Sequence, residues 1–219
     1  MPRLRQIAKA DAHPFAQRLY RMLFGDRDPV TEPGTATGTP GNWWTVTAAV
    51  PDLFDHIAAG FAFYRDEKRV LDPKLRELGQ TRTGYARQSQ FVYSQHMKAC
   101  REVGLEEHKI EAIRAWSTAT VFDQTERLVL AYTDCLVLEG GRVPDEVFDG
   151  LVDAIGNDAV LELTYIVCTY DMHATISKAL RLEYDDIDDR IVELPSPGGV
   201  GPSTRGSNDA MAVVDHLNT

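Results

Sequence analysis

Apolar residues recur at helical spacing along most of this chain, and convincing runs of alternating apolar and polar residues are scarce. A half-buried strand needs the two-residue period, whereas a helix packs through residues three and four apart. The pattern therefore predicts an all-α fold of roughly seven to nine helices. A length of 219 residues is enough for one such domain with an extension.

Residues that typically begin and end helices predict where the individual helices lie. Asp72 and Pro73 supply a cap and a first-turn proline, and Asp123 lies three residues before Glu126 in a capping-box arrangement. Gly104 suits the position just past a helix end. The predicted helices cover about 14–24, 52–65, 73–84, 84–105 as one amphipathic helix, 106–115, 123–140, 144–154 and 158–183.

Composition suggests three regions. Residues 1–51 are expected to form an N-terminal helix and a Gly/Pro/Thr-rich loop, centred on 25–44, and residues 52–190 a helical domain. Such a long loop in a compact domain usually contributes to function or to an interface between subunits. Residues 191–219 are predicted to be a flexible C-terminal tail with a short docking helix.

Charge and cysteine usage exclude several classes of function. The net charge is -10 and no Lys/Arg cluster is present, so we expect neither nucleic acid nor a membrane as a partner. The N-terminus lacks the apolar run of a signal peptide, and no stretch is long enough to span a bilayer. The three cysteines form no CxxC, which argues against a disulfide framework or a zinc knuckle. A reduced cytoplasm is the expected location.

One histidine interrupts the apolar stripe of the stretch 84–105. His96 is followed by Cys100 four residues on, which places the two side chains within reach on a helix. The histidine is a buried imidazole with a hydrogen-bond partner, a metal ligand or a proton carrier; "HMKAC" offers too few ligands to support a metal. The stripe consists of Ser89, Val92, His96, Ala99 and Val103.

The spacing of four residues resembles that of a known superfamily. Glu77, Ser89, Val92 and His96 stand at E-x11-S-x2-V-x3-H, which is similar to the E-x11-C-x2-C-x3-H signature of alkyl hydroperoxidase D-like proteins, with both cysteines replaced. The segments "LDPKLRELGQTRTGYARQSQFVYSQH" and "REVGLEEHKIEAI" resemble the carboxymuconolactone decarboxylase family of that superfamily. The resemblance covers roughly residues 52–186 and implies an alkyl hydroperoxidase D-like helical bundle.

Two departures from the family pattern narrow the implied chemistry. Ser89 and Val92 occupy the places of the two thiols, and a valine cannot act as a nucleophile, so the thiol chemistry of the redox branch is excluded. The glutamate that decarboxylase members often carry at the position of Val92 is also missing. The surviving pair is Glu77 and His96.

That pair supports a hypothesis of acid–base catalysis. Loss of CO2 from a conjugated or β-keto carboxylate leaves an enolate-like carbanion, which a histidine titrating near neutrality can protonate. The resemblance implies a cofactor-free lyase that acts on a small carboxylated or keto-enol substrate of aromatic or related catabolism. His96 would be the general acid/base and Glu77 its partner, with neither a metal nor a cofactor. Further candidates for substrate binding are Ser89, Tyr93, Tyr85 and Trp44.

Two other functions and several structural alternatives stay open. The chain is alternatively a thiol-dependent peroxidase using Cys100, or a non-catalytic oligomeric or ligand-binding protein. Periodicity alone places Glu77 beside the apolar stripe of its helix and predicts an exposed glutamate, and it makes Cys100 a small core residue. Trp43 and Trp44 suit interface packing as well as a pocket. We expect a homo-oligomer, either a dimer, a trimer or a hexamer.

Overall fold

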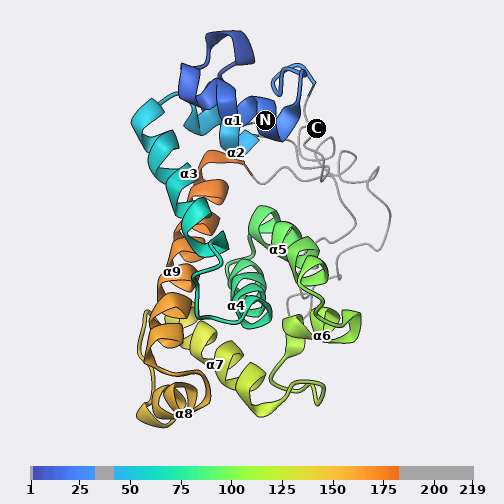
Figure 1. Ribbon diagram of the computed structural model, residues 1–219. Helices are drawn as coiled ribbons and strands as arrows, with labels where there is room; N and C mark the ends of the chain where they lie inside the picture. Colours follow the sequence, from blue (N-terminus) through green and yellow to red (C-terminus); the bar gives the residue numbers. More distant parts are fainter. Residues whose placement is uncertain (1, 33–41, 183–219) are drawn as a thin grey trace, which may run out of the picture.

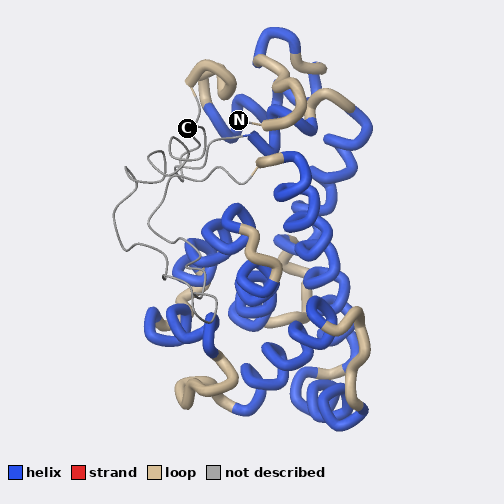
Figure 2. The backbone as a smooth tube through the Cα atoms, turned by 180° about the vertical axis from the view of Figure 1, so that it is seen from behind, coloured by secondary structure: helices blue, strands red, loops and turns tan. Residues whose placement is uncertain are grey.

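The computed structural model describes residues 2–32 and 42–182. Within these ranges the chain forms nine α-helices and two short 3-10 helices, with no strand (Figure 2), which confirms the predicted all-α class. The middle of the predicted loop and the predicted C-terminal tail with its docking helix lie outside the described residues. No described helix is long and apolar enough to cross a membrane.

From α2 onward the helices follow one another along the chain with short connections, whereas residues 25–41 separate α1 from α2 (Figure 1). Their bounds are η1 Lys9–Asp11, α1 Pro14–Phe24, α2 Asn42–Thr47, α3 Pro51–Arg65, α4 Pro73–Ala86, α5 Gln90–Glu102, α6 Glu107–Ala112, η2 Ile113–Ala115, α7 Gln124–Leu138, α8 Asp145–Ile155 and α9 Asn157–Leu180.

Helix α4 lies at the centre of the bundle, where it contacts α5, α7 and α9 (Figure 1). All residues from 77 to 84 are buried, although many of them are polar. Their polar groups are satisfied within the bundle: Arg82 Nε pairs with Asp134 Oδ1 of α7 at 2.6 Å, and Thr83 Oγ1 donates to the Gly79 carbonyl at 2.8 Å. A buried polar helix of this kind holds its neighbours in fixed positions because each buried polar group needs its partner.

The N-terminal helices form a second, smaller core against α3. Tyr20 of α1 and Phe54 of α3 are completely buried there and meet edge to face, with ring centroids 6.3 Å apart. Trp43 of α2 packs in a third cluster with residues near the end of α9. These contacts fix α1 and α2 over the upper parts of α3 and α9 (Figure 1).

Three predicted helix boundaries differ from the structure. The stretch 84–105 is not one helix: α4 ends at Ala86, Gln88 adopts a positive φ of 52°, and Ser89 caps the start of α5 by accepting from Val92 N at 3.4 Å. Helix α2 occupies part of the segment predicted to be a loop, because its tryptophans find a buried surface to pack on. Helix α9 ends at Leu180, earlier than predicted.

Candidate active site

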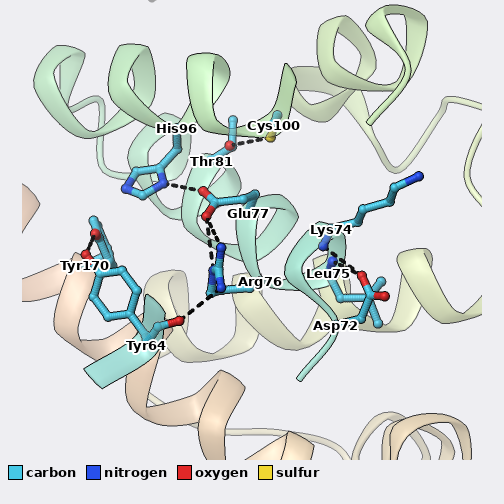
Figure 3. A network of polar contacts seen from close by, with 10 residues as sticks. All are labelled: Tyr64, Asp72, Lys74, Leu75, Arg76, Glu77, Thr81, His96, Cys100 and Tyr170. Atoms are coloured by element: carbon cyan, nitrogen blue, oxygen red, sulfur yellow. Dashed lines mark hydrogen bonds and ion pairs between the residues drawn. The ribbon is translucent and has the colours of Figure 1, made fainter. Parts of the chain in front are cut away.

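The two residues singled out by spacing meet in the structure. Glu77 projects from α4 and His96 from α5, and His96 Nδ1 lies 2.7 Å from Glu77 Oε2 (Figure 3). Both residues are buried, at 4% and 7% exposure. The prediction that Glu77 is exposed, based on periodicity, is wrong because residues 77–84 of α4 are all buried.

Three neighbours surround the Glu77 carboxylate. Arg76 Nε and Nη2 donate to Oε1 at 3.1 and 2.8 Å. The Gln80 amide faces the same carboxylate and, with its nitrogen turned toward it, donates to Oε2 at 3.1 Å and to Oε1 at 3.2 Å. Burial by itself would raise the pKa of Glu77, but His96 and Arg76 outweigh it and hold the pKa of this carboxyl below its ordinary value. Glu77 is therefore ionised at neutral pH.

An ionised carboxylate fixes the orientation of the imidazole. It can only accept, so His96 Nδ1–H donates to Glu77, as in other carboxylate–histidine pairs. The opposite ring nitrogen, Nε2, points away from Glu77 (Figure 3). The ring itself packs edge-on against Tyr170 of α9, with centroids 4.3 Å apart. His96 thus presents one nitrogen to its partner while the other stays available for proton transfer.

His96 and Glu77 line a cavity of about 470 Å³. Aromatic side chains from α2, α3, α5 and α9 line it together with aliphatic ones, and charged side chains of α3, α4 and α5 also contribute. Helices α1, α2, α3, α4, α5 and α9 all supply residues: Leu19, Met22, Leu23, Trp43, Trp44, Ala58, Phe61, Ala62, Tyr64, Arg65, Glu77, Phe91, Val92, Gln95, His96, Lys98, Ala99, Glu102, Tyr170 and His173. This size and character suit a small, largely apolar molecule with a few polar groups.

A second histidine belongs to the same cavity. His173 of α9 is surrounded by rings, with centroid distances of 4.8 Å to Trp43, 5.3 Å to Phe61 and 5.1 Å to Tyr170. Burial, together with nearby His96, lowers the pKa of His173 to about 4. It is therefore neutral under the conditions in which His96 would transfer a proton.

Of the other predicted substrate-binding residues, only Trp44 lines this cavity. Ser89 is fully buried and caps α5, while Tyr93 is buried in the main core beside Tyr85, with ring centroids 5.8 Å apart. Sequence reasoning did not select Tyr64, Phe61, Tyr170 or His173. The three-residue spacing of Tyr170 and His173, which places them on one face of α9, is the one signal that could have found two of them.

Cys100 is not suited to thiol chemistry. It is completely buried in the main core, and its Sγ contacts Thr81 Oγ1 at 3.2 Å. Burial raises the pKa of this thiol to about 12, and the charge of Glu77 adds to the effect. These observations give no support to the peroxidase alternative, which requires an accessible thiolate. They agree with the expectation that Cys100 is a core residue.

No cluster of three or more potential metal ligands occurs in residues 2–32 or 42–182. The candidate site within these ranges consists of a carboxylate–imidazole pair, hydroxyl groups and aromatic rings. The carboxylate–imidazole pair suits proton transfer, and the hydroxyl groups suit hydrogen bonding.

Comparison with known proteins connects this site to a family. The model of the Carboxymuconolactone decarboxylase family matches residues 51–134, which include both Glu77 and His96. The match covers less than half of the 219 residues, so it relates this part of the chain to the family. An uncharacterized Escherichia coli (strain K12) protein, YnjA, is 26% identical over 144 residues, which span 65% of this chain and 76% of YnjA.

Solved structures show the same fold at low sequence identity. A protein of unknown function from Agrobacterium tumefaciens, described as a candidate antioxidant defence protein AhpD, aligns with a TM-score of 0.56 at 20% identity over 66% of this chain and 94% of its own. The debrominase Bmp8 aligns with a TM-score of 0.60 at 16% identity over 77% of this chain and 84% of its own. A single-residue variant of Bmp8 in complex with 2,3,4-tribromopyrrole aligns over 94% of this chain and 92% of its own. The TM-score is 0.60 at 14% identity. These alignments show that the chain has an AhpD-like fold.

Proposed function

We propose that this protein is a cofactor-free lyase that removes CO2 from a small carboxylated, keto-enol-type substrate by acid–base chemistry. The observation that carries the proposal is the 2.7 Å contact between Glu77 and His96 at the wall of a cavity large enough for such a molecule. Membership of the 51–134 segment in the carboxymuconolactone decarboxylase family is consistent with this reaction class.

The proposed reaction has two steps. The C–C bond to the carboxylate breaks, CO2 leaves, and the electron pair of the bond passes through the α-carbon onto the conjugated carbonyl oxygen as an enolate. The His96 imidazolium then transfers the Nε2 proton to carbon and is reprotonated by water. Glu77 keeps the proton on Nδ1 and stabilises the imidazolium between the two steps.

The surroundings of the pair favour such chemistry. His96 and Glu77 are both buried, which limits water around them and strengthens the electrostatic interaction between them. Arg65, at the exposed end of α3, also lines the cavity and would attract a substrate carboxylate. A non-catalytic binding protein could use the same cavity, so turnover is what separates the lyase from that alternative.

A substrate panel tests the proposal directly. The protein is incubated with ring-cleavage lactones and β-keto acids while CO2 release and ultraviolet absorbance are followed. We expect turnover of at least one compound, and a loss of about 10²–10⁴-fold in kcat for His96→Gln and for Glu77→Gln, the effect typical of a general acid/base.

Matched controls are available on the surface. His108 and Glu111 are both exposed on or near α6, so His108→Gln and Glu111→Gln make the same chemical changes away from the cavity and should retain full activity. Turnover that survives His96→Gln, or a complete lack of CO2 release across the panel, would refute the proposed lyase.

A further inference from the structure

Two tyrosines from distant parts of the chain meet beside the carboxylate–histidine pair. Tyr64 lies near the end of α3 and Tyr170 in α9, and their hydroxyls are hydrogen-bonded to each other (Figure 3). Both side chains are buried, at 3% and 5% exposure, and both line the cavity. The pair is therefore shielded from solvent but in contact with the space that a substrate would occupy.

The hydroxyl pair is close to the proton-transfer machinery. The Tyr170 ring packs edge-on against the His96 ring, with centroids 4.3 Å apart. Arg76, which binds the Glu77 carboxylate, also donates from Nη1 to the Tyr64 backbone carbonyl at 3.0 Å. The position of Tyr64 is thus tied to the same network that orients His96 (Figure 3).

The two tyrosine hydroxyls together have one more hydrogen-bond donor than their mutual contact uses. Two phenol hydroxyls carry two protons, and their mutual hydrogen bond uses only one of them. The second proton has no acceptor among the residues that the structure describes. Buried tyrosine hydroxyls normally find a partner, so an oxygen atom of a bound molecule is the natural acceptor here.

We propose that the Tyr64–Tyr170 hydroxyl pair donates a hydrogen bond to the substrate oxygen on which negative charge develops when CO2 leaves. This inference rests on the proposed lyase function and narrows its substrate class: the molecule carries a carbonyl conjugated to, or β to, the departing carboxylate. No proton is transferred from either tyrosine. The electron pair of the broken bond resides on the oxygen until His96 protonates carbon.

The chemistry of the two phenols suits a donor that keeps its proton. Burial raises the pKa of both Tyr64 and Tyr170 above the ordinary value, and the negative charge of Glu77 raises it further. Because one hydroxyl donates to the other, the outer O–H is polarised and its hydrogen bond to an anionic oxygen is strengthened. Removing one such donor from an oxyanion site typically lowers kcat by about 10²–10³-fold.

A flat phenolate tests the donor without any turnover. 4-Nitrophenol is a suitable probe because its ionised form resembles an enolate oxygen and absorbs visible light. At a pH where the free compound is mostly neutral, we expect the protein to bind it as the phenolate. Tyr64→Phe and Tyr170→Phe should each weaken this binding by about tenfold or more, the loss of one charge-assisted hydrogen bond.

Two controls separate hydrogen bonding from packing. Tyr165→Phe removes a hydroxyl from the exposed face of α9 and should bind the phenolate like the unmodified protein. 4-Nitroanisole has a similar shape but no charge, and its binding, followed by quenching of the Trp43 and Trp44 fluorescence, should be the same in all variants. Equal losses for both compounds, or no phenolate binding by the unmodified protein, would overturn the inference.

Taken together, the binding and turnover experiments can support or refute this inference independently of the lyase proposal. If the substrate panel shows no CO2 release but the phenolate preference depends on both tyrosines, the donor pair stands and the assigned reaction is wrong. If His96→Gln abolishes turnover while Tyr64→Phe and Tyr170→Phe leave kcat unchanged, the lyase stands and the donor pair is refuted. We expect both tyrosine variants to lower kcat with little change in KM.

Discussion

His173 shows how one buried side chain can make stability depend on pH. It is buried and in contact with the rings of Trp43, Phe61 and Tyr170. With a pKa of about 4 in the folded protein and 6.5 when exposed, it binds a proton more readily after unfolding. Protonation therefore favours the unfolded state as the pH falls below 6.5.

We expect the free energy of unfolding to decrease by about 2 kcal/mol on going from about pH 7 to about pH 5 because of His173. Urea unfolding followed by circular dichroism at the two pH values measures the change. His173→Phe should remove most of this dependence, whereas His108→Gln, an exposed change, should keep it. Glu77 acts in a different window: its lowered pKa stabilises the fold above 4.5, and that contribution is lost only as the pH falls through the folded-state value. An unchanged pH dependence in His173→Phe would contradict the assignment.

At the residue scale, the sequence spacing singled out Glu77 and His96, and the structure brings these two side chains into contact. Periodicity misplaced Glu77 because a helical pattern assumes that one face is exposed to solvent, whereas every residue of α4 from 77 to 84 is buried. Tyr64 and Tyr170 lie 106 residues apart and come together only through tertiary packing. No local pattern in the sequence encodes that contact.

At the scale of elements, the junction of α4 and α5 sets the position of the candidate site. The two helices approach so closely that a Cβ at Gly84 would lie 2.6 Å from Tyr93 N and 2.8 Å from Tyr93 Cα. These are backbone atoms, so no side-chain rotation can relieve the overlap. Glycine at position 84 therefore fixes the distance between the helix that carries Glu77 and the helix that carries His96.

We expect Gly84→Ala to destabilise the protein by about 1–3 kcal/mol, the typical cost of overpacking. Gly60→Ala is the matched change within α3, where an added Cβ meets nothing within 4 Å, and it should stabilise by about 0.5–1 kcal/mol through helix propensity. Chemical denaturation of both variants provides the comparison. Equal effects at the two positions would show that the close approach at Gly84 is not limiting.

Helix boundaries were predictable where capping chemistry was explicit. Asp72 caps α4 and Asp123 forms a capping box with Glu126 at the start of α7, as their sequence patterns predicted. The break at 87–89 was missed because Gln88 is an unusual residue for a positive φ, and only Ser89 signalled a new start. Helix α2 was missed because it is short and stabilised by the burial of its tryptophan rather than by periodicity.

At the scale of the whole molecule, α9 has two apolar faces. One packs in the core, and the other exposes Leu161, Tyr165, Cys168 and Met172 at spacings of four, three and four residues. Phe63 of α3 extends this surface by packing edge-on against Tyr165, with centroids 5.7 Å apart. The repeat suits packing against an identical helix, so we expect the proposed homo-oligomer to use this face.

Leu161→Glu and Met172→Glu should shift the protein toward the monomer, because each places a charge at one end of the apolar stripe. Sedimentation velocity or light scattering after size-exclusion chromatography measures the mass. Leu138→Glu makes the same change at a similarly exposed position on α7 and should not alter it. An assembly that persists in both α9 variants would exclude this face as the interface.

The cavity wall is assembled from separate stretches of the chain. Glu77 and His96 lie inside the family-matched segment 51–134, whereas Trp43 and Trp44 precede it and Tyr170 follows it. Two relatives could therefore be nearly identical across that segment and still admit molecules of different size, because the walls that decide admission are encoded elsewhere. Likeness in the matched segment is thus a guide to the Glu77–His96 pair and a poor guide to the molecule that the cavity admits.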